Sequence, residues 1–479
     1  MTGRMSMTTP IITTLAEYQT EFWIPVAKQL RALGHTPHFI SFDNRSTELL
    51  QAEGFAVRDA YKVVLHEGAE EEILASIDMP DFATISRHER YAFGTSDNTA
   101  MRRKLARAIQ ATHDAIRDMP ADARPIIIQE LGGFLSVIGV FYAARDLGLD
   151  NLFIEPSFFR GRLLFTANSF LAPSFRSAAT AAPDSDVDEY LAHTVTSGSL
   201  VIPAKDRHHY ASALGKMLTK RNAIRLWQKS VDKYVLGKKQ EFGFIGHHVA
   251  VHLRNVLNSR RLAAHYTPLE RLGSYIYYPL HVPGDVALTI RSPAYLDQLA
   301  LVEELAASLP SGTSLAIKEH PAMVGMIEVG RLKELLARRR NVAILPPATN
   351  NYQVMRGSQA VVTVNSKSGA EAGLLDKPVI VLGNAFYRDA PFANAVENPG
   401  EAAVAIKSAL SGSTAICEHA AKRGWFAGLW RETLPGELYD LDPDNIRQVA
   451  QTLLDALDAH AARRGGSTPA KPDMATLTR

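Results

Sequence analysis

The chain has 479 residues, enough for roughly two or three domains, and its 46% hydrophobic content excludes a wholly disordered protein. The 52 Lys and Arg residues nearly balance the 50 Asp and Glu residues, which excludes a protein whose whole surface binds nucleic acid. The single cysteine, Cys417, excludes an intramolecular disulfide framework and a multi-cysteine zinc site.

The first 150 residues alternate strands with helices. Predicted strands cover 10–15, 38–42, 55–57, 125–129 and 151–154, and predicted helices cover 17–33, 46–52, 98–119 and 133–147. Strands that alternate with helices indicate a parallel sheet covered on both faces. The sequence therefore predicts an N-terminal Rossmann-like domain over 8–175, on the acceptor and catalytic side of a cleft.

The next segment, 176–268, breaks this alternation and is strongly basic. Between residues 203 and 262 it holds 13 Lys or Arg residues, opposed only by Asp206, Asp232 and Glu241. Aromatic residues lie between the charges. We expect a mostly helical insert or linker. Two interpretations of its charge are open: a solvated pair of basic helices, or a surface that rests on anionic lipid.

The alternation of strands and helices resumes at Tyr275. Predicted strands cover 275–280, 314–318, 342–345, 360–364 and 377–382, and predicted helices cover 293–309, 329–338 and 367–375. This pattern predicts a second Rossmann-like domain over 269–440, then a C-terminal helix over 441–462 and a disordered tail over 463–479. The expected fold class is α/β, with two Rossmann-like domains facing a cleft. Ligands of such sheets bind beyond the carboxyl ends of the strands.

Ionisable residues follow the predicted strand 314–318 at once, in the run Lys318-Glu319-His320-Pro321. Pro321 continues neither helix nor sheet, so His320 is held in a turn at the cleft edge. A lysine ammonium and a histidine donor suit a phosphate or a carboxylate. An ordinary polar strand end would give the same pattern, and both interpretations stay open.

Small polar residues follow the strand 360–364 and open a helix that contains Glu371. Free N–H groups at a helix start favour an anion. One helix cap needs a single polar side chain, whereas this turn combines four small residues: Asn365, Ser366, Ser368 and Gly369. The pattern therefore favours anion binding over an ordinary cap. It is not a Walker A loop, because the Gly-Lys-Ser/Thr ending is missing.

Carboxylates end two predicted strands of the first half. Glu130 follows the strand 125–129, and Glu155 follows the strand 151–154. A carboxylate at this edge can act as a base or a nucleophile toward the other domain. The alternative for Glu155 is an ion pair with Arg160 that orders the loop. His248 and His252 have a spacing that can hold a metal, but no carboxylate accompanies them, so no metal site is expected.

Four motifs of the second half resemble, in order, those of the bacterial capsule polysaccharide biosynthesis family, which includes the capsule Kdo transferases. Residues 277–285 look like its "PLQ-x-x-x-D" strand end, with His281 in place of Gln. Residues 318–321 look like its "K-x-H-P" motif and 363–372 like its "T-x-N-S-x-x-G-x-E-A" motif. Residues 377–387 look like its "GKPV…LG-x-A-x-Y" continuation. In the first half, Ser157 replaces the glycine of its "E-x-G-[FY]-x-R" segment, which ends at Arg160.

The resemblance implies a GT-B glycosyltransferase that uses a CMP-activated sugar, above all CMP-Kdo, with no metal or other cofactor. It implies that the donor is held by Lys318, His320, Pro321, Asn365, Ser366, Ser368, Gly369 and Glu371, the last near the ribose. Glu155 or Glu130 would be the catalytic carboxylate, and His320 would stabilise the leaving CMP. Arg160 and His281 are candidate cleft residues on the acceptor side.

Other classes of protein remain open: a UDP-sugar transferase or a nucleotide-sugar epimerase with the same fold, and a non-catalytic factor of polysaccharide assembly or export. The apolar run 11–15 is too short for a secretory signal, and no charge-free run reaches the roughly 18 to 20 residues of a membrane span. We therefore expect a cytoplasmic protein, peripheral on the inner membrane if the insert binds lipid. Expected partners are a lipid-linked or oligosaccharide acceptor and other capsule assembly proteins, but no nucleic acid.

Overall fold

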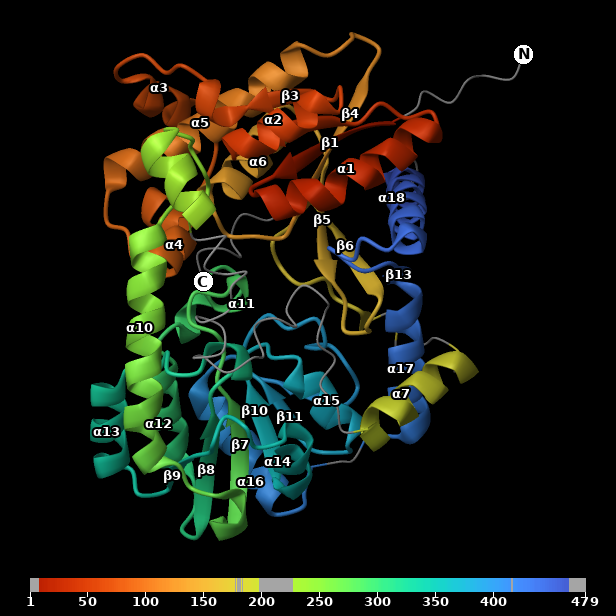
Figure 1. Ribbon diagram of the computed structural model, residues 1–479. Helices are drawn as coiled ribbons and strands as arrows, with labels where there is room; N and C mark the ends of the chain where they lie inside the picture. The colour runs from red at the N-terminus through yellow and green to blue at the C-terminus, as the bar shows by residue number, and fades with distance from the viewer. Residues whose placement is uncertain are drawn as a thin grey trace.

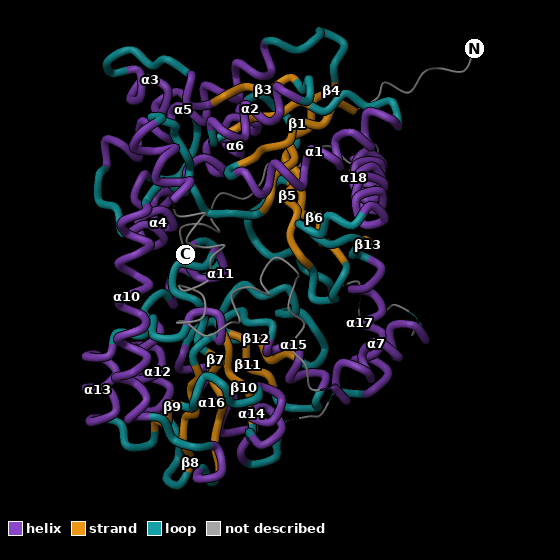
Figure 2. Tube along the Cα trace, in the orientation of Figure 1, coloured by secondary structure: helices purple, strands orange, loops and turns teal. Residues whose placement is uncertain are grey.

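The computed structural model describes residues 8–176, 178, 182, 184–197, 227–414 and 417–464. Two largely parallel sheets lie in two domains, one above the other, with helices on the faces of each sheet (Figures 1 and 2). The predicted α/β class with two Rossmann-like domains is confirmed. Both sheets have strands that are buried along almost their whole length, as expected where helices cover both faces.

The N-terminal sheet has seven strands in the order β13-β6-β5-β4-β1-β2-β3. Its parallel strands are β1 (Thr8–Thr14), β2 (His38–Ser41), β3 (Ala56–Asp59), β4 (Arg124–Glu130) and β5 (Asn151–Pro156). Two antiparallel strands, β6 (Arg162–Ala167) and β13 (Leu434–Pro435), extend one edge. Glu130 pairs with Ile154 in this register, so Glu130 and Glu155 end neighbouring strands.

The helices of this domain are α1 (Glu17–Ala32), α2 (Asn44–Ala52), α3 (Ala69–Ser76), α4 (Phe82–Phe93), α5 (Asn98–Arg117) and α6 (Leu135–Asp146). Helix α6 is apolar all round because it lies between the sheet and α5. A Cβ on Gly139 would stand 2.6 Å from the Cβ of Ala108, so glycine permits this close approach. The sequence pattern gave no signal for α3 and α4. Asp81 caps the N-terminus of α4, and His88 of the same helix lies at the domain boundary, next to Thr289.

The C-terminal sheet is parallel throughout, in the order β12-β11-β10-β7-β8-β9. Its strands are β7 (Ser274–Pro279), β8 (Thr313–Lys318), β9 (Val342–Ile344), β10 (Ala360–Thr363), β11 (Val379–Val381) and β12 (Ala393–Ala395). Its helices are α11 (Val286–Thr289), α12 (Gln298–Ser308), α13 (Val329–Arg338), α14 (Asn351–Gly357), α15 (Ser368–Leu374), α16 (Pro399–Leu410) and α17 (His419–Arg431). The helix predicted over 293–309 starts at Gln298, because Asp297 caps it by accepting the N–H of Ala300.

After α17 the chain returns to the N-terminal domain earlier than residue 440. Strand β13 pairs with β6, and α18 (Pro443–Arg464) packs along α1 (Figure 1). The buried side chains of Val449 and Leu453 join the core cluster that contains Phe22 and Trp23. The C-terminal helix is therefore part of the N-terminal domain. Residues 465–479 of the predicted tail lie outside the described residues.

Only part of the basic insert lies within the described residues. Its described helices are α7 (Ser185–Ser197) and α10 (Ile245–Leu262), and its shorter helical turns are η4 (Val231–Val235), Ala263–His265 and, at its end, Leu269–Arg271. Helix α10 runs along one side of the molecule from the N-terminal to the C-terminal domain (Figure 1). None of the described helices is long and apolar enough to cross a membrane.

Candidate functional site

The carboxyl ends of β7, β8 and β10 lie side by side, since β7 is the central strand of the three. This order brings together residues that are far apart in the sequence. The N–H of Asn365, after β10, donates to Nε2 of His281, after β7, at 3.2 Å. Lys318 ends β8 opposite Pro279 of β7. The three runs singled out in the sequence therefore meet at one sheet edge.

Lys318 is a buried cation, with 3% of its surface exposed. Its ammonium group has no hydrogen-bond acceptor or ion-pair partner among the residues that the structure describes. Burial lowers the pKa of Lys318 to about 8, and the negative charge of Glu371 opposes this shift. A buried ammonium costs free energy unless an anion accompanies it, so this position suits a phosphate ligand.

Glu371 is the buried carboxylate of the same edge. Burial raises its pKa to about 7, against the opposing charges of Lys367 and Lys318 and a hydrogen bond from Asn351. The Asn351 side-chain amide donates to Glu371 at 3.4 Å and to Ser368 Oγ at 3.0 Å. Asn351 thus ties Glu371 to the polar turn. The sequence analysis missed it; the only signal is the pair of asparagines at 350–351, where Asn350 caps α14.

The side-chain donors of Asn365 in the polar turn 365–369 are used within the protein, whereas its Oδ1 has no partner among the described residues. The amide of Asn365 donates to the carbonyl of Ala287 and, at 3.3 Å, to Ser292 Oγ. Ser366 Oγ accepts the N–H of Ser368 at 3.3 Å. A Cβ on Gly369 would stand 2.3 Å from the hydroxyl of Tyr387, so packing against this ring requires the glycine. These side chains shape the strand edge, and the buried charge comes from Lys318.

His281 lies between this turn and a cavity. Burial lowers its pKa to about 4, so the imidazole is neutral. Because Nε2 accepts the N–H of Asn365, the ring proton is assigned to Nδ1, which finds no acceptor among the described residues. The side-chain amide of Gln298 holds the His281 backbone on both sides, at 2.6 Å and 3.0 Å. His281 is therefore a rigid, buried donor.

The cavity next to His281 has a volume of about 270 Å³. Its wall is mainly apolar, and the residues that form this part are Leu280, Val282, Leu296, Met323, Met326 and Ile327. His281 and His320 line it on the side of the strand ends, and Tyr91 of α4 closes it from the N-terminal domain. Asp297, Gln298, Glu319, Glu328 and Arg331 also line it, and a largely apolar cavity with polar groups at its wall is typical of a small-molecule pocket.

Glu155 faces the C-terminal domain and pairs with Arg291 rather than with Arg160. The Arg291 guanidinium donates to both carboxylate oxygens, at 2.7 Å and 3.3 Å. The expected pair with Arg160 is not formed: the Arg160 N–H donates to the Tyr190 hydroxyl at 2.8 Å. A second contact between the domains lies nearby, where Lys367 Nζ donates to the Ser157 carbonyl at 2.7 Å. The end of β5 therefore faces the polar turn.

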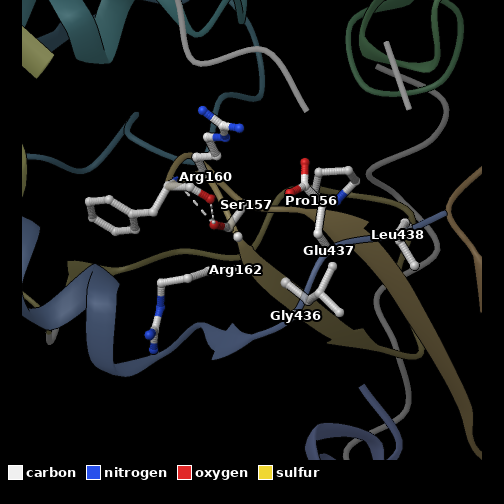
Figure 3. A pocket seen from close by; sticks show the side chains of 10 residues that line it. Pro156, Ser157, Arg160, Arg162, Gly436, Glu437 and Leu438 are labelled. Carbon is white, nitrogen blue, oxygen red and sulfur yellow. Dashed lines mark hydrogen bonds between the residues drawn. The ribbon is translucent and has the colours of Figure 1, made fainter. Parts of the chain in front are cut away.

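Arg160 and Ser157 line a second cavity, of only about 10 Å³, together with Glu437 (Figure 3). Figure 3 shows the guanidinium groups of Arg160 and Arg162 pointing away from each other. Ser157 Oγ accepts the N–H of Phe159 at 3.0 Å and donates to its carbonyl at 2.9 Å. Ser157 thus closes a tight turn where the resembled family has glycine. This cavity is too small for a sugar.

Glu130 lies on the neighbouring strand but contacts the C-terminal segment instead of the second domain. It accepts a hydrogen bond from the hydroxyl of Tyr439, which is itself buried. Burial, and after it the charge of Glu130, raises the pKa of Tyr439. Among the described residues, no group of three or more His, Cys, Asp or Glu side chains is arranged to hold a metal ion.

Comparison with known proteins finds a family that matches part of this chain. Residues 191–392 match the model of the family described as "Capsule polysaccharide biosynthesis protein". Protein FixF of Sinorhizobium fredii is 28% identical over 137 residues, which cover 28% of this chain and 33% of that protein. The chain thus aligns with only a third of the length of this curated relative.

Two solved structures are distantly similar. Thermosulfurimonas dismutans KpsC, a beta Kdo 2,7 transferase, is 13% identical with a TM-score of 0.36, over 73% of this chain and 89% of that one. Neisseria meningitidis UDP-GlcNAc 2-epimerase, bound to UDP-GlcNAc, is 13% identical with a TM-score of 0.28, over 93% and 100%. The family match includes His281, Lys318, His320 and Glu371, but neither Glu130 nor Glu155. The part of this chain that resembles the capsule polysaccharide biosynthesis family is therefore residues 191–392.

Proposed function

We propose that the protein is a glycosyltransferase of surface polysaccharide biosynthesis that binds its nucleotide-sugar donor on the C-terminal domain. The observation that carries this proposal is Lys318, a buried ammonium without a hydrogen-bond acceptor among the described residues, two positions before His320, which lines a cavity of about 270 Å³. The donor phosphate binds Lys318 and His320, and the nucleoside occupies the cavity. The match of residues 191–392 to the capsule polysaccharide biosynthesis family supports the same class of reaction.

A CMP-sugar, with CMP-Kdo as the first candidate, fits this edge better than a UDP-sugar. The phosphate of a CMP-sugar carries one negative charge, whereas the diphosphate of a UDP-sugar carries two. Among the described residues of this edge, Lys318 is the buried cation without a counter-charge in contact, since Lys367 reaches the carbonyl of Ser157. A neutral His281 adds a hydrogen bond but no charge. We propose that these groups stabilise the leaving CMP without a metal or other cofactor.

Glu155 is the proposed base. In the transfer step, an acceptor hydroxyl oxygen bonds to the anomeric carbon, the bond from that carbon to the phosphate oxygen breaks, and CMP leaves with the electron pair. The hydroxyl proton goes to Glu155, whose carboxylate the Arg291 guanidinium holds at the domain boundary. Glu130 is less suited because its partner, Tyr439, belongs to the N-terminal domain.

The acceptor is proposed to be lipid-linked or an oligosaccharide, and the insert is the part of the molecule that suits a lipid surface. Trp227 and Tyr234 are 71% and 68% exposed. Two of the three acidic residues between 203 and 262, Asp232 and Glu241, are buried, whereas Lys239 is exposed. Interfacial aromatic rings combined with lysines are typical of proteins that rest on anionic membranes.

The direct test is a transfer assay that follows release of CMP from CMP-Kdo with and without a capsular oligosaccharide or its lipid-linked form. The proposal predicts release that depends on the acceptor, together with an extended glycan. Conversion of a UDP-sugar into its epimer without any acceptor would assign the protein to the epimerases instead. Absence of turnover with every donor, from folded protein, would favour an assembly factor.

A further inference from the structure

The loop that forms the outer wall of the cavity, residues 320–327, is held from two sides. From within its own domain, Glu319 Oε1 accepts the N–H of Gly325 at 3.0 Å and that of Ile327 at 3.3 Å. Glu319 is itself buried, with 3% of its surface exposed. Both N–H groups are thereby taken up by one carboxylate, which sets the path of the loop between His320 and Ile327.

The second support comes from α10 of the insert. The side-chain amide of Asn258 donates to the carbonyl of Gly325 at 3.0 Å and to that of Ile327 at 3.5 Å. Gly325 has φ +86°, and a Cβ there would stand 2.1 Å from the carbonyl oxygen of Asn255. Only glycine permits this contact between the loop and the helix backbone. Helix α10 is therefore in direct contact with the loop that forms the wall of the cavity.

The other end of α10 is anchored in the N-terminal domain. Phe244, just before the helix, stacks on Phe93 of α4 with ring centroids 4.3 Å apart. Upstream, buried Glu241 pairs with Lys104 of α5 at 2.6 Å and accepts a hydrogen bond from Ser136 of α6 at 2.7 Å. The helix is about 27 Å long. Helix α10 thus connects the contacts with α4, α5 and α6 in the N-terminal domain to the wall of the cavity in the C-terminal domain.

We propose that α10 positions the nucleotide cavity, and that Asn258 is the positioning residue through which the N-terminal domain and the insert set the affinity of the C-terminal domain for nucleotide. The inference rests on the proposed function, since it takes the ligand of the cavity to be a nucleotide. Its consequence is reciprocal: nucleotide binding stabilises the docking of α10, because coupling between two sites acts equally in both directions.

The test uses the full chain and CMP as the probe, with Kd measured by calorimetry and amide hydrogen exchange measured over 320–327. Asn258→Ala removes the two donated bonds, and Asn258→Asp places a carboxylate against two carbonyl oxygens. Asn341→Ala is the matched control, because the Asn341 amide also donates to a backbone carbonyl of this domain, that of Ala306, at 2.7 Å and away from the cavity. The thermal midpoint of each variant reports general destabilisation.

We expect Asn258→Ala to raise the Kd for CMP about three- to tenfold and Asn258→Asp to raise it further, with faster exchange at Gly325 and Ile327. Asn341→Ala should change neither, even where it lowers the thermal midpoint equally. Binding of CMP by the wild type with unchanged Kd in both Asn258 variants would overturn the coupling alone. Failure of the wild type to bind any nucleotide would overturn the proposed function, and the coupling with it.

Discussion

Glu371 is a carboxyl group whose ionisation the fold opposes. Its pKa is raised to about 7 from an ordinary 4.5, because it is buried. Between these two values the native state binds the proton and the unfolded chain does not. The stability contributed by the protonated group is therefore complete below about pH 4.5 and is lost as the pH rises through about 7. The site tolerates this cost because Glu371 also lies in the field of Lys318.

The pH dependence gives a first prediction. Glu371→Gln cannot ionise, so its stability does not change as this carboxyl titrates. Between pH 4 and pH 8 the free energy of unfolding of this variant should therefore rise relative to that of the wild type by about 3 kcal/mol. Thermal or urea unfolding at several pH values measures this difference. Glu334→Gln, at an exposed position of α13, is the control and should show no such trend. A pH-independent difference between Glu371→Gln and the wild type would show that this carboxyl ionises normally.

The two carboxylates of the N-terminal domain give a second prediction. Glu155→Gln should lower kcat of sugar transfer about a hundredfold or more while the Kd for CMP stays unchanged, because the base acts on the acceptor and not on the nucleotide. Glu130→Gln should change kcat only a few-fold. Initial rates and calorimetry on both variants decide this. Equal losses of kcat in the two variants would contradict the assignment of Glu155 as the base. A loss confined to Glu130→Gln would assign Glu130 as the base instead.

At the scale of elements, the sequence pattern identified the strands that lead into the site, because buried apolar runs followed by Lys318 or by the Asn365 turn are local features. It could not identify β13, whose two residues are too few for a periodic signal. The packing of α18 against α1 could not be predicted either, because the two helices are more than 400 residues apart in the sequence. Asn351 was missed for the same reason: its role depends on the order of the strands, not on its neighbours in the sequence.

The position of α18 gives a third prediction. Leu453 is fully buried against the core of the N-terminal domain, so Leu453→Ala should lower the free energy of unfolding of that domain by about 2 to 4 kcal/mol. Leu441→Ala, at a position that is 56% exposed, should have little effect. Urea unfolding measures both. An unchanged midpoint for Leu453→Ala would contradict the packing of α18 on α1.

The described part of the insert gives a fourth prediction. Trp227→Ser combined with Lys239→Glu should reduce sedimentation with vesicles that contain phosphatidylglycerol, because the change removes an exposed ring and reverses a charge. Lys238 is a poorer choice, since it pairs with Glu48 at 2.6 Å. Lys407→Glu, an exposed charge change on α16, is the control. Equal vesicle binding by the double variant and the wild type would exclude this surface as the lipid contact.

At the scale of the whole molecule, several polar contacts join the two domains. Glu155 reaches Arg291, Lys367 reaches the Ser157 carbonyl, and His88 of α4 lies 2.8 Å from Thr289 Oγ1. An apolar contact joins the domains as well, since Phe158 and Phe159 belong to the same buried cluster as Tyr277 of the C-terminal sheet. The proposed nucleotide edge of the C-terminal domain and Glu155 of the N-terminal domain therefore lie at the same domain boundary. The sequence placed Glu155 at this boundary, but its partner Arg291 emerged only from the fold.

The central claim is that the buried ammonium of Lys318 binds the phosphate of a nucleotide. The most direct test is calorimetric titration of CMP, CDP and UDP into the wild type, Lys318→Met and the exposed control Lys407→Met. We predict that the wild type and the control bind CMP most tightly, and that Lys318→Met binds it at least tenfold more weakly although its thermal midpoint is higher, because a buried charge has been removed. Undiminished CMP binding by Lys318→Met would contradict the account.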